Sequence, residues 1–198
     1  MSIFHIHKFK TAKEKWVVGR EIITGKTNPY HDGLKDNCLS FTNADDGEKV
    51  TFDYFFSHLA KMQSKQIVDL VTAAQATAKE NYHRELLFEK VRAENAPDLP
   101  SRLKCLYASE SFAGINGWLK FVQDNSRCHP FERTGYEIVE LRPSANTKIF
   151  KTQDGALWGV ENLSEAELIE RAKSYWSASC VGMEELLLEG QYVVVNVF

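Results

Sequence analysis

Apolar residues at helical spacing run through the middle of this chain and limit its fold more than any other feature. The i, i+3, i+4 repeat begins at Ile67 and continues to Leu86, which predicts that these residues share the buried face of a helix. Pro97 and Pro100 forbid its continuation, because proline lacks the backbone donor that a helix needs. The apolar stretch Phe52 to Met62 predicts a shorter helix ahead of it. We therefore expect a helical block over about residues 52–95.

Strand patterns bracket this block. Ile3 to His7 alternates between two faces, which predicts a half-buried strand. Tyr192 to Phe198 is apolar on both faces, which predicts a strand in the interior of a sheet. Ser164 to Glu167 has the capping-box pattern that opens a helix. Further strands are expected at residues 105–109, 136–141 and 147–150. A chain of 198 residues in this order predicts a single α+β domain with a long helical insertion.

Composition narrows the class of protein. The hydrophobic fraction of 43% and the aromatic fraction of 12% suit a chain that buries a core. The formal net charge is −3, so a broad basic surface for nucleic acid is not supported. No apolar run approaches the roughly 18 residues that span a bilayer, and the N-terminus lacks the pattern of a signal peptide. Four widely spaced cysteines predict reduced thiols, so we expect a cytoplasmic protein with no membrane partner.

His5 and His7 are the first candidates for chemistry. Two histidines two apart on a strand point to the same side, and imidazole pairs of this kind can hold a metal ion. A metal site needs a third ligand, and the other histidines show no ligand spacing. Three interpretations stay open: a metal site, two polar residues on a strand face, and a single functional histidine at the end of the strand.

Arg102 and Tyr107 form the second candidate. Tyr107 lies on an expected strand, where its ring could stack on a flat ligand. Arg102 precedes that strand and could grip a phosphate. The alternative is that Tyr107 is an ordinary core residue and Arg102 a surface cation.

The third candidate is the pair Glu184 and Glu185, which opens an otherwise apolar strand. Strand alternation sends the two side chains to opposite faces, so only one can act as the catalyst. A carboxylate at the mouth of a sheet is a usual place for an electrostatic catalyst. The alternative is a solvated entrance to the strand.

Several common enzyme motifs do not occur in the sequence. It contains no G-x-S-x-G, no G-x-x-x-x-G-K-[ST] and no G-x-G-x-x-G. This argues against an α/β-type serine hydrolase, a P-loop enzyme and a Rossmann dehydrogenase.

The order of the three candidates resembles the ADP-ribosyltransferase superfamily in its His-Tyr-Glu variety. Ile3-Phe4-His5-Ile6 looks like the first strand of that family, which carries the histidine. Leu106-Tyr107-Ala108-Ser109 and the helix expected after it look like the second element. Glu185-Leu-Leu-Leu, followed by Glu-Gly and a final strand, looks like the third. The chain is also similar to an uncharacterised bacterial family known only as a domain of unknown function.

The resemblance implies a small mixed or antiparallel split sheet and an enzyme that uses NAD as its substrate. Glu185 is then expected to be the catalytic carboxylate, with Glu184 a solvated neighbour. His5 would hydrogen-bond a ribose, and no metal is required. Tyr107 would stack on nicotinamide, with Tyr136 and Tyr175 as alternatives for this role. Met183 stands where arginine-modifying members carry a second Glu or Gln, so the resemblance does not imply arginine as the acceptor.

The resemblance further implies a toxin-like or phage-defence effector that modifies a protein or a nucleic acid, with an antitoxin as a further partner. Two other functions stay open. One is a metal-dependent hydrolase built on His5 and His7, and the other is a non-catalytic interaction module in which the helical block binds a partner.

Overall fold

The computed structural model describes residues 2–9, 11–26, 28, 32, 40–42, 49–51, 65–126, 135–160 and 163–198. The helix expected over Phe52 to Met62 lies outside the described residues. The same holds for three histidines and two cysteines: His31, His58, His129, Cys38 and Cys128. Both described cysteines are free thiols, Cys105 and Cys180.

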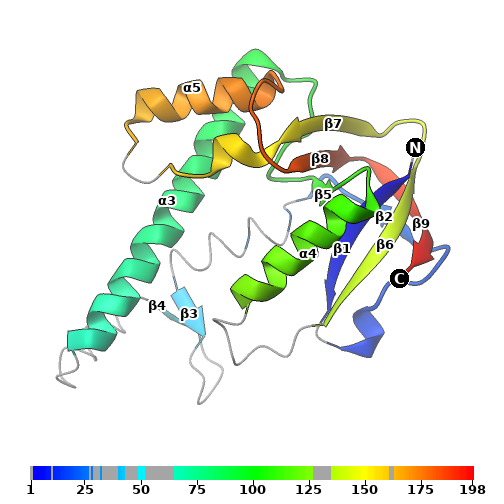
Figure 1. Ribbon diagram of the computed structural model, residues 1–198, viewed down its shortest axis with the longest axis horizontal. Helices are drawn as coiled ribbons and strands as arrows, with labels where there is room; N and C mark the ends of the chain where they lie inside the picture. Colours follow the sequence, from blue (N-terminus) through cyan, green and yellow to red (C-terminus); the bar gives the residue numbers. More distant parts are fainter. Residues whose placement is uncertain are drawn as a thin grey trace.

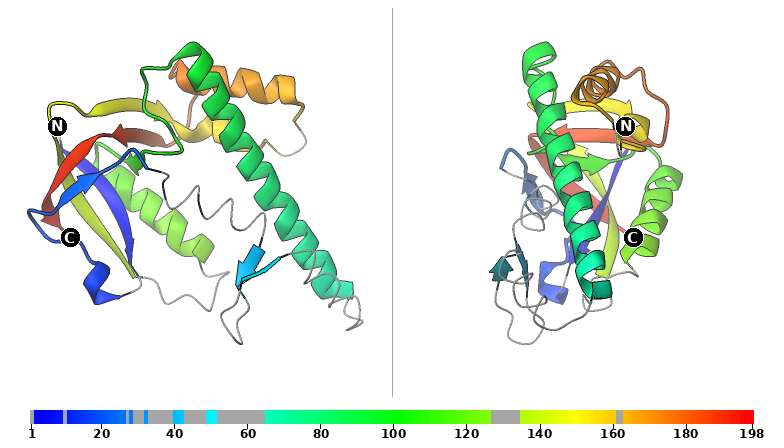
Figure 2. Two further views of the ribbon diagram at one scale, coloured as in Figure 1. Left: turned by 180° about the vertical axis from the view of Figure 1, so that it is seen from behind. Right: turned by 90° about the vertical axis from the view of Figure 1, so that its left-hand side faces the viewer.

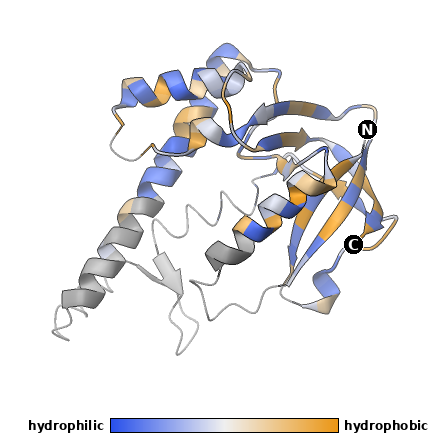
Figure 3. Cartoon of the chain, viewed as in Figure 1, coloured by the Kyte–Doolittle hydropathy of each residue, from blue (hydrophilic) through white to orange (hydrophobic). Residues whose placement is uncertain are grey.

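Four antiparallel strands form the first sheet (Figure 1). Its order is β1-β6-β9-β2, with β1 at Ile3–Phe9, β6 at Gly135–Pro143, β9 at Gln191–Val197 and β2 at Glu21–Ile23. Orange and blue segments alternate along β1 and β6 in Figure 3, as expected for strands with one buried face. β9 lies between β6 and β2, which confirms the interior position predicted from its two apolar faces.

Three antiparallel strands form the second sheet, in the order β5-β8-β7. Their bounds are Leu106–Ala108 for β5, Glu184–Glu189 for β8 and Lys148–Gln153 for β7. Two further short strands, β3 (Ser40–Thr42) and β4 (Lys49–Thr51), pair with each other. Phe4 and Ser109 exchange backbone hydrogen bonds of 2.8 and 2.9 Å, so the first and second sheets meet at β1 and β5. The predicted α+β class with antiparallel sheets is confirmed.

Gly190 carries the chain from one sheet to the other. β8 ends at Glu189 and β9 begins at Gln191, so a single residue separates strands of different sheets. The φ angle of Gly190 is +137°, a conformation that side-chain-bearing residues rarely adopt. A Cβ at this position would also lie 2.9 Å from the Cα of Thr147. The turn therefore requires glycine.

Two helices pack against each other on one side of the second sheet. Helix α3 (Lys65–Asn95) ends just before Pro97, as expected, and α5 (Glu165–Trp176) lies across its C-terminal half (Figure 2). The predicted capping box opens α5: the Ser164 hydroxyl accepts from the Glu167 N–H, and the Glu167 carboxylate accepts from the Ser164 N–H at 2.8 Å. Among the described helices, none has the length and apolar character that crossing a membrane requires.

A third helix, α4 (Phe112–Ser126), packs on β1, with the rings of Phe4 and Phe112 at 5.6 Å. Ile115 of this helix is buried, whereas Ala113 is exposed. Two short 3₁₀ helices, η1 (Ala12–Glu14) and η2 (Asp154–Leu157), complete the described elements.

The apolar core is divided by the second sheet. Leu187 belongs to a cluster with residues of α3 and α5, such as Phe88 and Tyr175. Leu186 and Leu188 belong to a cluster with residues of the first sheet, such as Ile3. Because neighbours on a strand face opposite sides, β8 is covered on both faces. Side chains on one face of β8 therefore point towards α3 and α5, and side chains on the other face point towards the first sheet.

Candidate functional site

The strands that carry the candidate residues are neighbours. β1 bridges β5 through Phe4 and Ser109, and β5 pairs with β8 from Leu106 opposite Leu188 to Ala108 opposite Leu186. The first strand therefore lies next to the 105–109 segment, and the 185–198 segment is close to both, with β8 beside β5 and β9 beside β6.

Arg102 is the centre of a buried ion-pair network. Its guanidinium donates to Glu85 at 2.9 Å and to Glu185 at 2.8 Å, and it contacts the Tyr175 hydroxyl. Burial disfavours the charged guanidinium and by itself would lower the pKa of Arg102. The surrounding groups, Glu85 most strongly, outweigh this effect and raise the pKa above its ordinary value. Arg102 is 2% exposed, so a phosphate in solvent cannot reach it. The expected phosphate contact does not fit this position.

Glu85 is the member of the network that sequence reasoning missed. Helical spacing had predicted Leu86 on the buried face of α3, yet Leu86 is 41% exposed and Glu85 only 1%. Burial alone would raise the pKa of Glu85, but Arg102 and then Arg84 hold it below its ordinary value. Glu85 can be buried because Arg102, which is distant in the sequence, neutralises its charge. The pattern of residues within the helix does not reveal this partner.

Tyr107 belongs to the same network. The Arg102 guanidinium lies between the rings of Tyr107 and Tyr175, 5.0 and 4.9 Å from their centroids. The Tyr107 hydroxyl donates to the backbone oxygen of Arg102 at 3.1 Å. Tyr107 is opposite Leu187 in the strand register and so points to the same side as Glu185. Of the two interpretations of Tyr107, this position favours the core residue.

Glu184 and Glu185 face opposite sides of β8, as alternation predicts. Glu185 shares the face of Leu187, is 5% exposed and is engaged by Arg102 and Tyr175. Glu184 lies on the other face, and its side chain is 28% exposed. Of the two acids, Glu184 is therefore the one that a ligand can reach.

Glu184 is held at the start of α4. One carboxylate oxygen accepts from the Ser109 hydroxyl and from the Glu110 backbone N–H, both at 2.8 Å. The Trp118 indole N–H donates to the Glu184 backbone oxygen at 3.0 Å. Gly114 permits this packing, because a Cβ there would lie 2.6 Å from the Ser109 hydroxyl. The N-terminal end of a helix also favours a negative charge.

Lys151 holds the second oxygen of the Glu184 carboxylate. Its ammonium lies 2.9 Å from that oxygen and also pairs with Glu110. Partial burial favours the neutral acid, but hydrogen bonds from Lys151 and then Ser109 lower the pKa of Glu184 below its ordinary value. The carboxylate is therefore ionised and fixed at neutral pH.

His5 is fixed by a backbone contact. Its Nδ1 donates to the Tyr107 carbonyl oxygen at 2.8 Å, and its ring stacks on Trp16 at 5.4 Å. His5 shares a strand face with Ile3, which packs against Leu186 and Leu188. His5 therefore lies on the side of the second sheet that Glu184 faces. The expected convergence of His5 with Glu185 is not found, because the two side chains lie on opposite sides of the second sheet. This contradicts a transferase site built on His5 and Glu185.

The environment of His5 predicts how stability changes with pH. Burial lowers the pKa of His5 from 6.5 to about 4. Between these values the unfolded chain binds more protons, so the free energy of unfolding falls as the pH drops from 6.5 towards 4. The amide of a His5→Asn variant can still donate to the Tyr107 oxygen but does not titrate. We expect the free energy of unfolding of this variant to fall by about 1–2 kcal/mol less than that of wild type between pH 7 and pH 5. Urea unfolding at each pH measures this. Parallel pH profiles for variant and wild type would contradict it.

A metal site on His5 and His7 is not supported by the geometry. His7 uses Nε2 on the Glu14 carbonyl oxygen at 2.9 Å, as His5 uses Nδ1 on Tyr107. In the part of the chain that the structure describes, no three His, Cys, Asp or Glu side chains are grouped to hold a metal ion. The ring of Trp16 lies against both imidazoles, 4.3 Å from His7 and 5.4 Å from His5.

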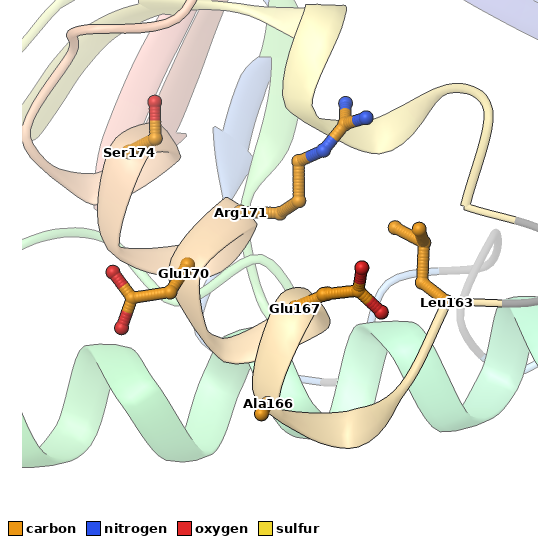
Figure 4. A pocket seen from close by; sticks show the side chains of 6 residues that line it. All are labelled: Leu163, Ala166, Glu167, Glu170, Arg171 and Ser174. Atoms are coloured by element: carbon orange, nitrogen blue, oxygen red, sulfur yellow. The ribbon is translucent and has the colours of Figure 1, made fainter.

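Two surface hollows lie apart from these residues. The larger, about 500 Å³, follows one side of α5 (Figure 4) and is lined by Leu163, Ala166, Glu167, Glu170, Arg171 and Ser174. A second, of about 250 Å³, adjoins it near Cys180. The Glu167 carboxylate is already used by the capping box, and Glu170 pairs with Lys173. Neither hollow is lined by an acid of β8, so both lie away from the fixed carboxylate of Glu184.

The fold and site define an antiparallel α+β protein that presents one ionised carboxylate where its two main sheets meet. The chain belongs to the family described as "Protein of unknown function (DUF2441)", whose model matches residues 3–198. The expected similarity to an uncharacterised family is therefore confirmed. No curated protein matches the chain.

Proposed function

We propose that this protein cleaves NAD between nicotinamide and ribose and transfers ADP-ribose to a macromolecule. The observation that carries the proposal is that β1, β5 and β8 are neighbours, since these strands bear His5, Tyr107 and the two acids. The resemblance to the His-Tyr-Glu transferases requires these three distant segments to meet. Their adjacency where the sheets part supports a split sheet of that type.

We assign the catalytic carboxylate to Glu184 in place of Glu185. Loss of nicotinamide develops positive charge on the ribose, an oxocarbenium-like state. A carboxylate that stabilises this charge must be ionised, fixed and within reach of the sugar. Glu184 meets these conditions, with its position fixed by donors at 2.8 Å and its side chain 28% exposed. Glu185 is covered by Arg102 and Tyr175.

His5 suits the orientation of the dinucleotide. With Nδ1 donating to a carbonyl, the neutral ring leaves Nε2 as an acceptor for a ribose hydroxyl. Burial keeps the pKa of His5 at about 4, so the ring adds no positive charge beside the developing cation. Arg102 and Tyr107 then act behind the site, where they join β5 and β8 to α3 and α5.

Transfer from labelled NAD tests the proposal. Incubation of the purified protein with cell extract and NAD labelled in the adenylate phosphate is expected to release nicotinamide and label a macromolecule. Digestion of the product by protease or nuclease then identifies the acceptor as protein or nucleic acid. The Glu184→Gln variant is the matched blank, because it keeps the size of the side chain and loses its charge.

A negative result in this experiment would overturn the proposal. If wild type releases no nicotinamide and labels nothing, the non-catalytic interaction module becomes the better function. The same two proteins test the toxin-like or defence role, which rests on family resemblance alone. Expression of wild type is expected to slow growth and Glu184→Gln to relieve this, so equal inhibition by both would contradict that role.

A further inference from the structure

The diphosphate of NAD needs a cationic partner, and Arg102 cannot supply it. The guanidinium is 2% exposed and is divided between Glu85 and Glu185. To reach a phosphate it would have to leave the buried Glu185 without its cation and Glu85 with Arg84 alone, which is strongly unfavourable. A cation that serves the diphosphate has to be exposed and close to Glu184.

Lys151 has both properties. It lies on β7 opposite Leu186, so its side chain shares the face of Glu184. Its ammonium is 2.9 Å from the Glu184 carboxylate, and its side chain is 54% exposed. The pair with Glu110 is also at the surface, with a Glu110 side chain that is 32% exposed. Exposed ion pairs contribute little to stability, so Lys151 can exchange partners at small cost.

We propose that Lys151 binds the diphosphate of NAD and releases one oxygen of Glu184 when it does so, an inference that rests on the proposed function. In the free protein the Lys151 ammonium neutralises the oxygen of Glu184 that Ser109 and Glu110 do not hold. A diphosphate attracts the ammonium with two charges and several acceptor oxygens. The flexible four-carbon stem allows the ammonium to move without a change in the strand.

This exchange makes the carboxylate available only when substrate is bound. A cation at 2.9 Å from Glu184 opposes the positive charge that develops on the ribose. Its transfer to the diphosphate removes that opposition and leaves the carboxylate facing the sugar. Lys151 is therefore a binding residue for the phosphates, and Glu184 is the catalytic residue.

Substrates with and without phosphates test the proposal. Lys151→Met is compared with Lys148→Met, a matched change at an exposed lysine of the same strand. With NAD, Lys151→Met is expected to raise KM by about tenfold or more, the change that loss of one charge-assisted hydrogen bond produces, and to leave kcat within a few-fold. With nicotinamide riboside, which carries no diphosphate to draw Lys151 away, KM stays unchanged and Lys151→Met raises kcat, because the ammonium no longer neutralises Glu184. Lys148→Met behaves as wild type with both.

Inorganic pyrophosphate separates failure of this inference from failure of the proposed function. Titration calorimetry with pyrophosphate is expected to show binding to wild type and to Lys148→Met and loss of binding in Lys151→Met, whether or not NAD is cleaved. If wild type cleaves neither substrate, the proposed function fails, and the calorimetry alone decides the anion site. An equal rise in KM for NAD and for nicotinamide riboside, or pyrophosphate binding that Lys151→Met leaves intact, overturns the role of Lys151.

Discussion

Glu184→Gln is expected to lower the rate of NAD cleavage by roughly a hundred- to a thousand-fold, by analogy with the loss of one donor that stabilises a developing charge. The amide keeps the size of the side chain and its carbonyl oxygen can still accept from the Ser109 hydroxyl and the Glu110 N–H. Binding of NAD is therefore expected to persist while turnover is lost. Nicotinamide release under single-turnover conditions measures the chemical step, and NAD titration measures binding.

Variants of two other glutamates serve as controls for this result. Glu170→Gln removes an exposed carboxylate on α5 that pairs with Lys173, and is expected to leave turnover unchanged. Glu185→Gln weakens a buried hydrogen bond to a charged group, so it is expected to cost about 1.5–3 kcal/mol of stability. If folded Glu185→Gln is inactive and Glu184→Gln retains activity, the assignment of the two faces of β8 is reversed and Glu185 is the catalyst.

Arg102→Met is expected to destabilise the protein by about 3–5 kcal/mol, the cost of leaving a buried ion without its partner. Methionine fills much of the volume, but Glu85 and Glu185 lose the cation that they share. Since whole domains are stable by only about 5–15 kcal/mol, the variant is expected to be partly unfolded at room temperature. The free energy of unfolding in urea measures the effect.

Two further variants show whether unpaired buried charge causes the loss of stability in Arg102→Met. Combining Arg102→Met with Glu185→Gln removes the carboxylate that is left without a cation, while Glu85 keeps its ion pair with Arg84, and is expected to recover part of the lost stability. Lys173→Met breaks an ion pair in which the side chains are 51% and 72% exposed, and is expected to cost less than about 1 kcal/mol. An Arg102→Met variant as stable as Lys173→Met would show that the network is not what holds β8 against α3 and α5.

Much of the fold could be predicted because its signals are local. The ends of α3 and α5 follow from a proline and a capping box, which act within one turn of the chain. The interior position of β9 follows from two apolar faces. Leu86 shows the limit of this reasoning: its spacing is right for the core, yet the buried face of α3 is rotated towards Glu85 by contacts with another segment.

The sequence by itself determined that Glu184 and Glu185 open an apolar strand and face opposite ways, because alternation is a property of the extended backbone. Only the tertiary structure decided which of the two is buried. Arg102, 83 residues from Glu185, arrives on one face of β8, and Ser109, 75 residues from Glu184, arrives on the other. Burial and charge at these acids depend on such distant partners, and a single strand carries no record of which partner will cover which face.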